Sequence, residues 1–121
     1  MLLTDKYYTI SDLRKEAGSA VVSIILRSDC EVYRGHFPGN PISPGVCNIE
    51  MIKECAEEVI GKELRIQTIK QCRMKAVVSP AICPMLKIDM KYVPTSDGYS
   101  VTASIFDAQK IYMEFKGTMA V

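Results

Sequence analysis

The chain has 121 residues, 48% of them hydrophobic and 24% charged, and a formal net charge of +1 at pH 7. This length suits one domain over residues 1–121 with one hydrophobic core. The charge balance argues against a nucleic-acid partner, because phosphate binding requires a surplus of Lys and Arg. No apolar run approaches the roughly 18 residues that span a bilayer, and Asp5 lies where a signal peptide would be apolar. We therefore expect a cytoplasmic protein without a membrane partner.

The five cysteines indicate neither a disulfide framework nor a metal site. Their number is odd, they form no Cys-x-x-Cys pair, and the chain has only one histidine. Reduced thiols packed as small apolar side chains are the better interpretation. Cys47 has a second interpretation as a nucleophile, because a helix N-terminus would lower the pKa of its thiol, but a structural role is favoured.

The first part of the chain contains two predicted elements. Residues 1–17 allow a helix or a strand, because apolar residues at helical spacing compete with a Tyr-Tyr-Thr run that favours extended chain. Residues 21–27 are β-branched and apolar, which predicts a strand. Residues 29–34 then lead into a loop rich in glycine and proline.

A loop followed by a helix, residues 33–61, organises the chain. Ser43 is predicted as the helix N-cap and Pro44 as the first helical residue, and Gly61 is placed to end the helix in a left-handed conformation. Apolar residues recur between them at spacings of three and four, which predicts one buried face. The predicted face consists of Val46, Ile49, Ile52, Ala56 and Val59.

Three groups in this stretch could together perform acid–base chemistry. Gly45, at the helix start, presents a bare backbone N–H that can stabilise an oxyanion. Glu50 lies in the second turn and leans back toward that end, and His36 has an unperturbed pKa near neutrality. Each residue alone is better explained as a surface or packing residue. Together they form the set needed for proton abstraction next to a carbonyl.

Four further strands are predicted after the helix. They cover residues 64–78, 86–92, 99–106 and 111–120. The turn signal Pro-Thr-Ser-Asp-Gly at residues 94–98 predicts a hairpin, and residues 107–110 join the last two strands. Two strands, one helix and four strands with tight connections predict an α+β fold with an antiparallel sheet.

Residues 35–50, GHFPGNPISPGVCNIE, resemble the signature of the (R)-3-hydroxyacyl-acyl-carrier-protein dehydratases of fatty-acid biosynthesis, which have the hotdog fold. The His-Phe-Pro-Gly, the Pro-x-x-Pro-Gly-Val and the Glu fourteen residues after the His are all in register. The similarity continues more weakly over most of the chain from Val21 onward, whereas the first twenty residues match poorly. The resemblance implies a hotdog fold, with the antiparallel sheet wrapped around one α-helix and the first strand within residues 1–17.

The resemblance also implies an activity, the dehydration of a (R)-3-hydroxyacyl thioester to the trans-2-enoyl thioester. His36 would remove the α-proton, Glu50 would assist departure of the hydroxyl as water, and the Gly45 N–H would bind the thioester oxygen. The family uses no metal and no separate cofactor, because the substrate arrives on the phosphopantetheine arm of acyl carrier protein.

The family further implies self-association as a homodimer, or as a trimer of such dimers, with the His and the carboxylate of one site on different chains. An apolar acyl tunnel at the interface would be lined by Phe37, Ile42 and Val46. Basic residues near its mouth would steer the acidic carrier protein, although ordinary surface charge is the alternative for each. The candidates are Arg34, Lys70, Arg73 and Lys75.

The helix departs from the family pattern around Glu50. Met-Ile-Lys-Glu, residues 51–54, stands where small apolar residues and a Gln are usual, and Asn48 replaces an apolar residue. We do not expect the sheet to wrap so polar a helix on all sides, because unpaired charges are costly to bury. This departure keeps a second hypothesis open, a non-catalytic hotdog subunit that binds carrier protein or completes a heteromer. An acyl-CoA thioesterase is a more distant alternative, since that class lacks the His-Phe-Pro-Gly loop.

Overall fold

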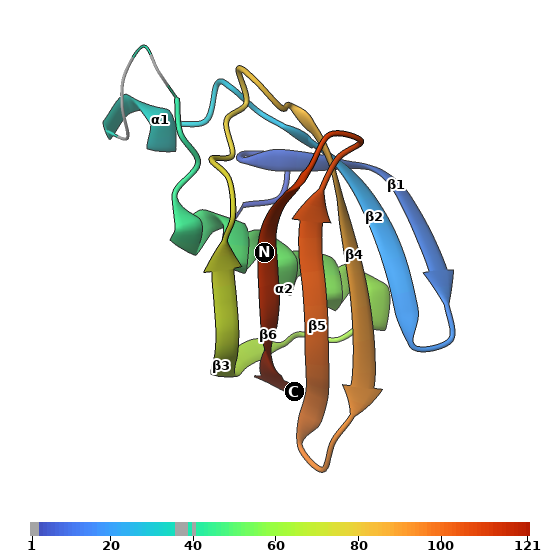
Figure 1. The fold of residues 1–121 in the computed structure, drawn as a ribbon. Coiled ribbons are helices and arrows are strands. Elements are labelled where there is room, and N and C mark those ends of the chain that lie inside the picture. Colours follow the sequence, from blue (N-terminus) through green and yellow to red (C-terminus); the bar gives the residue numbers. More distant parts are fainter. Residues whose placement is uncertain (1–2, 36–38, 40) are drawn as a thin grey trace.

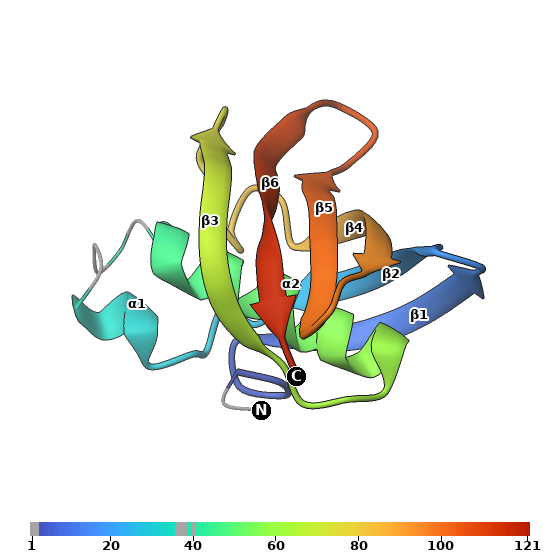
Figure 2. The same cartoon turned by 90° about the horizontal axis from the view of Figure 1, so that it is seen from below.

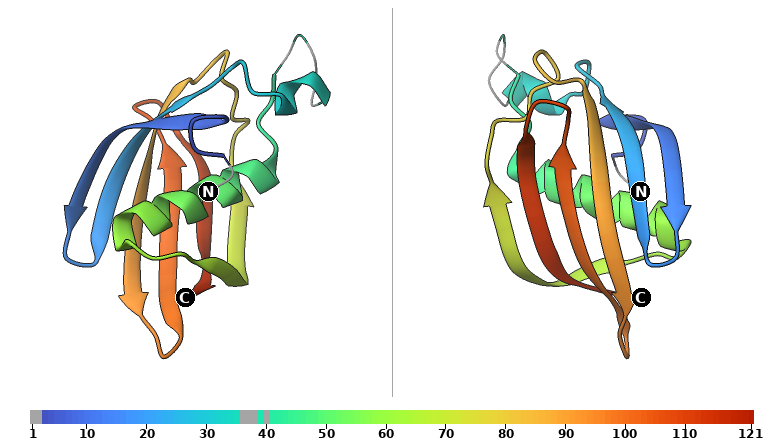
Figure 3. Two further views of the ribbon diagram at one scale, coloured as in Figure 1. Left: turned by 180° about the vertical axis from the view of Figure 1, so that it is seen from behind. Right: turned by 45° about the vertical axis from the view of Figure 1, so that its right-hand side comes forward.

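The computed structural model describes residues 3–35, 39 and 41–121. One six-stranded antiparallel sheet, in the order β1-β2-β4-β5-β6-β3, curls around a long helix (Figures 1 and 2). Seen from behind, that helix crosses the sheet on its inner face (Figure 3). The strands are β1 (Tyr8–Glu16), β2 (Ser19–Leu26), β3 (Arg65–Met74), β4 (Met85–Pro94), β5 (Gly98–Phe106) and β6 (Ile111–Ala120), and the helices are α1 (Val32–Gly35) and α2 (Gly45–Ile60).

The predicted order of elements is confirmed, with one addition. The ambiguous N-terminal stretch is extended: β1 pairs along its whole length with β2, and Gly18 turns the chain between them with φ +76°. The predicted hairpin joins β4 to β5, where the Thr95 N–H donates to the Gly98 carbonyl at 2.8 Å. The added element is α1, a single turn too short to leave a periodic signal in the sequence.

The buried face of α2 differs from the predicted face at its first residue. The residues of α2 that are buried are Asn48, Met51, Ile52, Glu54, Cys55, Ala56 and Val59. Val46 is 76% exposed, so its assignment to the core face was wrong. Residues 51, 52, 55, 56 and 59 form the apolar stripe on the sheet, and Val46 lies outside this stripe.

The start of α2 is also capped differently from the prediction. Pro44 is the N-cap residue, with φ −62° and ψ 142°, and no side chain in the described part of the chain caps the helix. Ser43 is buried instead: its N–H donates to the Val78 carbonyl at 2.7 Å, and its hydroxyl shares a 2.9 Å hydrogen bond with the Tyr33 hydroxyl. At the other end, Gly61 is left-handed with φ +80° and donates its N–H to the Glu57 carbonyl, as predicted.

The polar second half of α2 is more deeply buried than the sequence suggested. Glu54 is 0% exposed, and its carboxylate accepts hydrogen bonds from the Leu3 N–H at 2.9 Å, the Thr4 hydroxyl at 2.9 Å and the Tyr8 hydroxyl at 3.1 Å. The N-terminal segment therefore covers the helix where the sheet does not. It makes burial of this carboxylate possible by supplying donors.

Gly117 on β6 allows β3 and β6 to approach closely. A Cβ atom at this position would lie 2.3 Å from the Thr68 carbonyl oxygen of β3. We expect Gly117→Ala to lower the free energy of unfolding by about 2 kcal/mol, because backbone would have to move. Urea denaturation measures this change. Lys116→Ala, at the exposed neighbouring position, is the control, and equal losses for the two variants would contradict the prediction.

Candidate active site

The first turn of α2 presents unpaired backbone N–H groups. The Cys47 and Asn48 N–H groups both bond to the Pro44 carbonyl, at 3.1 and 3.2 Å. Within the described residues, neither the Gly45 N–H nor the Val46 N–H has an acceptor. Two free donors at a helix N-terminus can bind a carbonyl oxygen on which negative charge develops.

Met74, the last residue of β3, lies against this helix start. A Cβ atom on Gly45 would lie 3.1 Å from the Met74 Cε, and Met74 is 53% exposed. Together with the exposed Val46 it forms an apolar border beside the free N–H groups. The sequence did not mark Met74 as a site residue, because its position depends on how β3 ends beside α2.

Glu50 lies one turn into α2 and is partly exposed, with 30% of its side chain accessible. Its Oε2 atom is shielded from solvent and lies 3.1 Å from the Lys53 Nζ. Partial burial alone would lower the pKa of Lys53, but the Glu50, Glu57 and Glu54 carboxylates outweigh it and raise that pKa. Glu50 thus forms an ion pair with Lys53, which belongs to the segment 51–54 that departs from the family pattern.

The remaining predicted site residues are only partly placed. His36 and Phe37 lie outside the described residues. Ile42 is half-buried just before the helix, and Val46 is exposed in the first turn.

A buried polar network supports the helix start from beneath. The Tyr7 hydroxyl donates to the Asn48 Oδ1 at 2.7 Å, and the rings of Tyr7 and Tyr33 stack with their centroids 6.2 Å apart. Burial is the main reason that the pKa of each tyrosine is raised. Asn48, which seemed out of place in an apolar position, is therefore the acceptor for Tyr7.

Tyr7→Phe should destabilise the protein by about 1–3 kcal/mol, because the buried Asn48 amide oxygen would lose its donor. The Asn48 Nδ2 already has no partner among the described residues. Thermal unfolding monitored by circular dichroism measures the change, with Tyr92→Phe on β4 as a control for loss of a less buried hydroxyl. A Tyr7→Phe variant as stable as the control would contradict the role given to this network.

Cys47 does not have the character of a nucleophile. Partial burial, followed by the nearby Cys30 and Glu50, raises the pKa of its thiol. The expectation that the helix N-terminus would lower this pKa is wrong, because desolvation outweighs it.

The four basic candidates for carrier-protein contact differ in their surroundings. Lys70 and Arg73 are exposed on β3, whereas the Lys75 Nζ lies 3.1 Å from the Glu114 Oε1. The Arg34 Nη1 lies 3.9 Å from the Glu31 Oε1. A contact with an acidic partner is thus least hindered for Lys70, because the Arg73 guanidinium also donates to the Gln71 side-chain amide.

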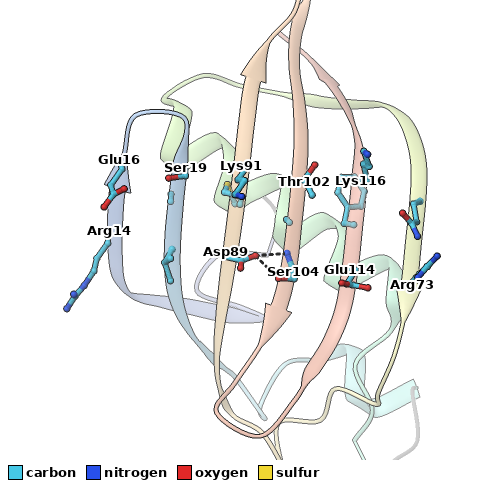
Figure 4. A pocket seen from close by; sticks show the side chains of 16 residues that line it. Arg14, Glu16, Ser19, Arg73, Asp89, Lys91, Thr102, Ser104, Glu114 and Lys116 are labelled. Carbon is cyan, nitrogen blue, oxygen red and sulfur yellow. Dashed lines mark hydrogen bonds between the residues drawn. The ribbon is translucent and has the colours of Figure 1, made fainter.

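A hollow on the outer face of the sheet is lined mainly by polar and charged residues. It lies opposite α2, and its labelled side chains carry both charges (Figure 4). Asp89 accepts a 2.6 Å hydrogen bond from the Ser104 hydroxyl at its centre. The polar lining favours the helix start over this hollow as the candidate active site.

Two further findings concern the described part of the chain. It holds no cluster of three or more His, Cys, Asp or Glu side chains that could bind a metal ion. None of its helices is long and apolar enough to cross a membrane.

Comparison with known proteins identifies the class. Residues 12–112 match the family model described as ApeI-like, ApeI dehydratase. Among solved structures, a chain of the dehydratase heterocomplex ApeI:P from Xenorhabdus doucetiae is similar with a TM-score of 0.73 at 16% identity, over 93% of this chain and 96% of that one. The fold is thus the hotdog fold, as the sequence motif implied. The chain belongs to the ApeI-like dehydratase family.

Curated relatives are dehydratases as well. The chain is similar to the 3-hydroxyacyl-[acyl-carrier-protein] dehydratase FabZ of Levilactobacillus brevis, 37% identical over 67 residues, which cover 50% of this chain and 45% of the relative. The FabZ of Ligilactobacillus salivarius is 26% identical over 117 residues, covering 91% and 81%. The match thus spans less than half the length of the first of these relatives.

Proposed function

We propose that this protein dehydrates a (R)-3-hydroxyacyl thioester carried by acyl carrier protein to the trans-2-enoyl thioester, in fatty-acid or related acyl-chain biosynthesis. The observation that carries the proposal is the start of α2. The N–H groups of Gly45 and Val46, which have no acceptor among the described residues, lie one turn before a partly exposed carboxylate, Glu50. The His-Phe-Pro-Gly motif with His36 precedes them directly in the chain.

The proposed reaction is an elimination of water. The His36 imidazole takes the proton from the carbon next to the thioester carbonyl, and the carbonyl oxygen gains negative charge. The Gly45 N–H donates to that oxygen, which lowers the barrier to proton removal. The electron pair then forms the C2–C3 double bond as the C3–O bond breaks. The C3 hydroxyl takes back the proton that His36 removed and departs as water, while Glu50 holds it in place.

A second copy of the chain would complete the site. β3 is an edge strand of ten residues, most of them exposed, and such an edge offers unpaired backbone groups to another strand. Val46 and Met74 are exposed apolar residues beside Gly45, and a covering subunit would turn this border into an apolar tunnel wall. We propose a homodimer as the basic assembly, with acyl carrier protein as the partner that delivers the substrate.

The second candidate function is a non-catalytic subunit of a heteromer. The observation that favours it is the ion pair between Glu50 and Lys53, which occupies one oxygen of the carboxylate. The solved ApeI:P relative is itself a heterocomplex.

His36→Ala separates the two functions. A dehydratase should lose about two or more decades of turnover in this variant, the scale for removal of a general base. Its affinity for a 3-hydroxyacyl carrier protein, measured by surface plasmon resonance, should remain close to that of the wild type. If the wild-type protein binds this ligand but forms no enoyl product, and His36→Ala behaves the same way, the result would support the non-catalytic subunit instead.

A further inference from the structure

One flank of α2 holds three charged side chains in a row. Glu50, Lys53 and Glu57 are spaced three and four residues apart, so they lie on one side of the helix. The Lys53 Nζ is 3.1 Å from the Glu50 Oε2 and 3.8 Å from the Glu57 Oε1. Lys53 therefore bridges the proposed reactive carboxylate and a carboxylate two turns further along the helix.

Burial makes this row more than an ordinary surface ion pair. Only 20% of the Lys53 side chain and 11% of the Glu57 side chain are accessible. The Glu50 Oε2 and the Glu57 Oε1 are both shielded from solvent, and neither has a hydrogen bond within the described residues. Exposed pairs restrain their side chains weakly because water competes. Here both oxygens are shielded from solvent beside Lys53, so the ammonium group restrains both carboxylates more firmly than in an exposed pair.

The far end of the row is fixed to the backbone. The Leu64 N–H, in the connection from α2 to β3, donates to the Glu57 Oε2 at 2.9 Å. Glu57 is therefore anchored at one oxygen and faces Lys53 with the other. A fixed Glu57 limits the positions that the Lys53 ammonium can take, and Lys53 in turn limits those of Glu50.

The row also distinguishes the two oxygens of Glu50. Side chains of a helix lean toward its N-terminus, but Lys53 lies one turn toward the C-terminus and engages Oε2 there. Oε1 has no hydrogen bond or ion pair with any residue that the structure describes. We propose that Lys53 is a positioning residue, which fixes the Glu50 carboxylate through Oε2 and leaves Oε1 to hold the departing hydroxyl. This role rests on the proposed function.

Lys53→Met tests the proposal, because it keeps most of the side-chain stem and removes the ammonium group. Misplacing a reactive group by about 1 Å can cost up to about 100-fold in rate, so we expect kcat to fall by about 10- to 100-fold. KM should change by less than about threefold, since the pair does not contribute to substrate binding in the ground state. Lys53→Arg should recover most of kcat. Lys87→Met, an equal change of charge on the exposed face of β4, should leave both constants unchanged.

A second readout does not depend on turnover. The side-chain carboxyl carbon of Glu50 can be followed by ¹³C NMR and identified by its absence in Glu50→Gln. Its resonance should shift in Lys53→Met, return toward the wild-type position in Lys53→Arg and stay unchanged in Lys87→Met. If the Glu50 resonance does not shift in Lys53→Met, the proposal is overturned, because the ion pair would not exist in solution.

The kinetic outcomes separate this proposal from the proposed function. An active wild type with a folded, equally active Lys53→Met variant overturns only the positioning role. A Lys53→Met variant with a raised KM and an unchanged kcat also overturns the positioning role, since Lys53 would then bind substrate. A folded wild type that dehydrates no chain length refutes the function, and the positioning role fails with it even if the NMR shift is seen.

Discussion

Glu50→Gln is expected to lower kcat for dehydration by about two decades or more, the usual scale for loss of a group that handles a proton or holds the leaving group. The glutamine amide has nearly the same shape as the carboxylate, but only one of its two terminal atoms can accept a hydrogen bond. It would also lose its charge attraction to Lys53, 3.1 Å from Oε2 in the native protein. Single-turnover formation of the enoyl product, followed by mass spectrometry of the carrier protein, measures the chemical step directly.

The matched control is Glu58→Gln, which makes the same change at an exposed position of the same helix. It should keep wild-type turnover. If Glu50→Gln also keeps wild-type turnover while folded, Glu50 is not the carboxylate of the site.

Glu54→Ala is expected to cost about 3–5 kcal/mol of stability, the largest loss predicted for the fold. The Glu54 carboxylate is the acceptor for three donors, from Leu3, Thr4 and Tyr8. Alanine would leave the Tyr8 hydroxyl in a buried position without this acceptor and would detach the N-terminal segment from α2. The free energy of unfolding in urea measures the loss, and hydrogen exchange should show faster opening of residues 3–8.

Glu58→Ala is the comparison for this variant, because Glu58 is exposed on the same turn. It should change the stability by less than about 0.5 kcal/mol. A Glu54→Ala variant that loses no more than Glu58→Ala would show that the buried carboxylate does not hold the N-terminal segment in place.

The sequence predicted the sheet better than the N-terminal region. Apolar and polar residues alternate along the stretches that form β4 and β6, and the turn at residues 94–98 is another local signal. The structure confirms both strands and the hairpin between β4 and β5. The propensities of residues 1–17 did not decide between helix and strand, and only the family resemblance placed a strand there, because the extended form depends on pairing with β2. Local residue propensities do not contain this long-range pairing between strands.

The candidate site was predicted from a motif, and its surroundings were not. The motif singled out Gly45 and Glu50, and the structure places them one turn apart at the exposed start of α2. Tyr7, Met74 and Lys53 were missed as neighbours of the site. Tyr7 lies just before β1 and Met74 ends β3, so both approach the site only through the fold. The spacing of three between Glu50 and Lys53, in contrast, was a usable signal.

The prediction of Ser43 as the N-cap was wrong because of a contact with a residue distant in the sequence. Ser43 has the right chemistry and position to cap α2, yet its hydroxyl bonds to Tyr33 in the core. A local preference is overridden when a distant side chain offers a buried partner. Local sequence rules therefore predicted where α2 begins to within a residue, but not what holds its start.

The most direct test of the account is to incubate purified protein with a short and a long (R)-3-hydroxyacyl carrier protein and measure loss of one water from the acyl chain by mass spectrometry. The account predicts trans-2-enoyl product from at least one chain length, with the His36→Ala protein slower by about two decades or more. Folded wild-type protein that releases no water from either substrate would contradict it.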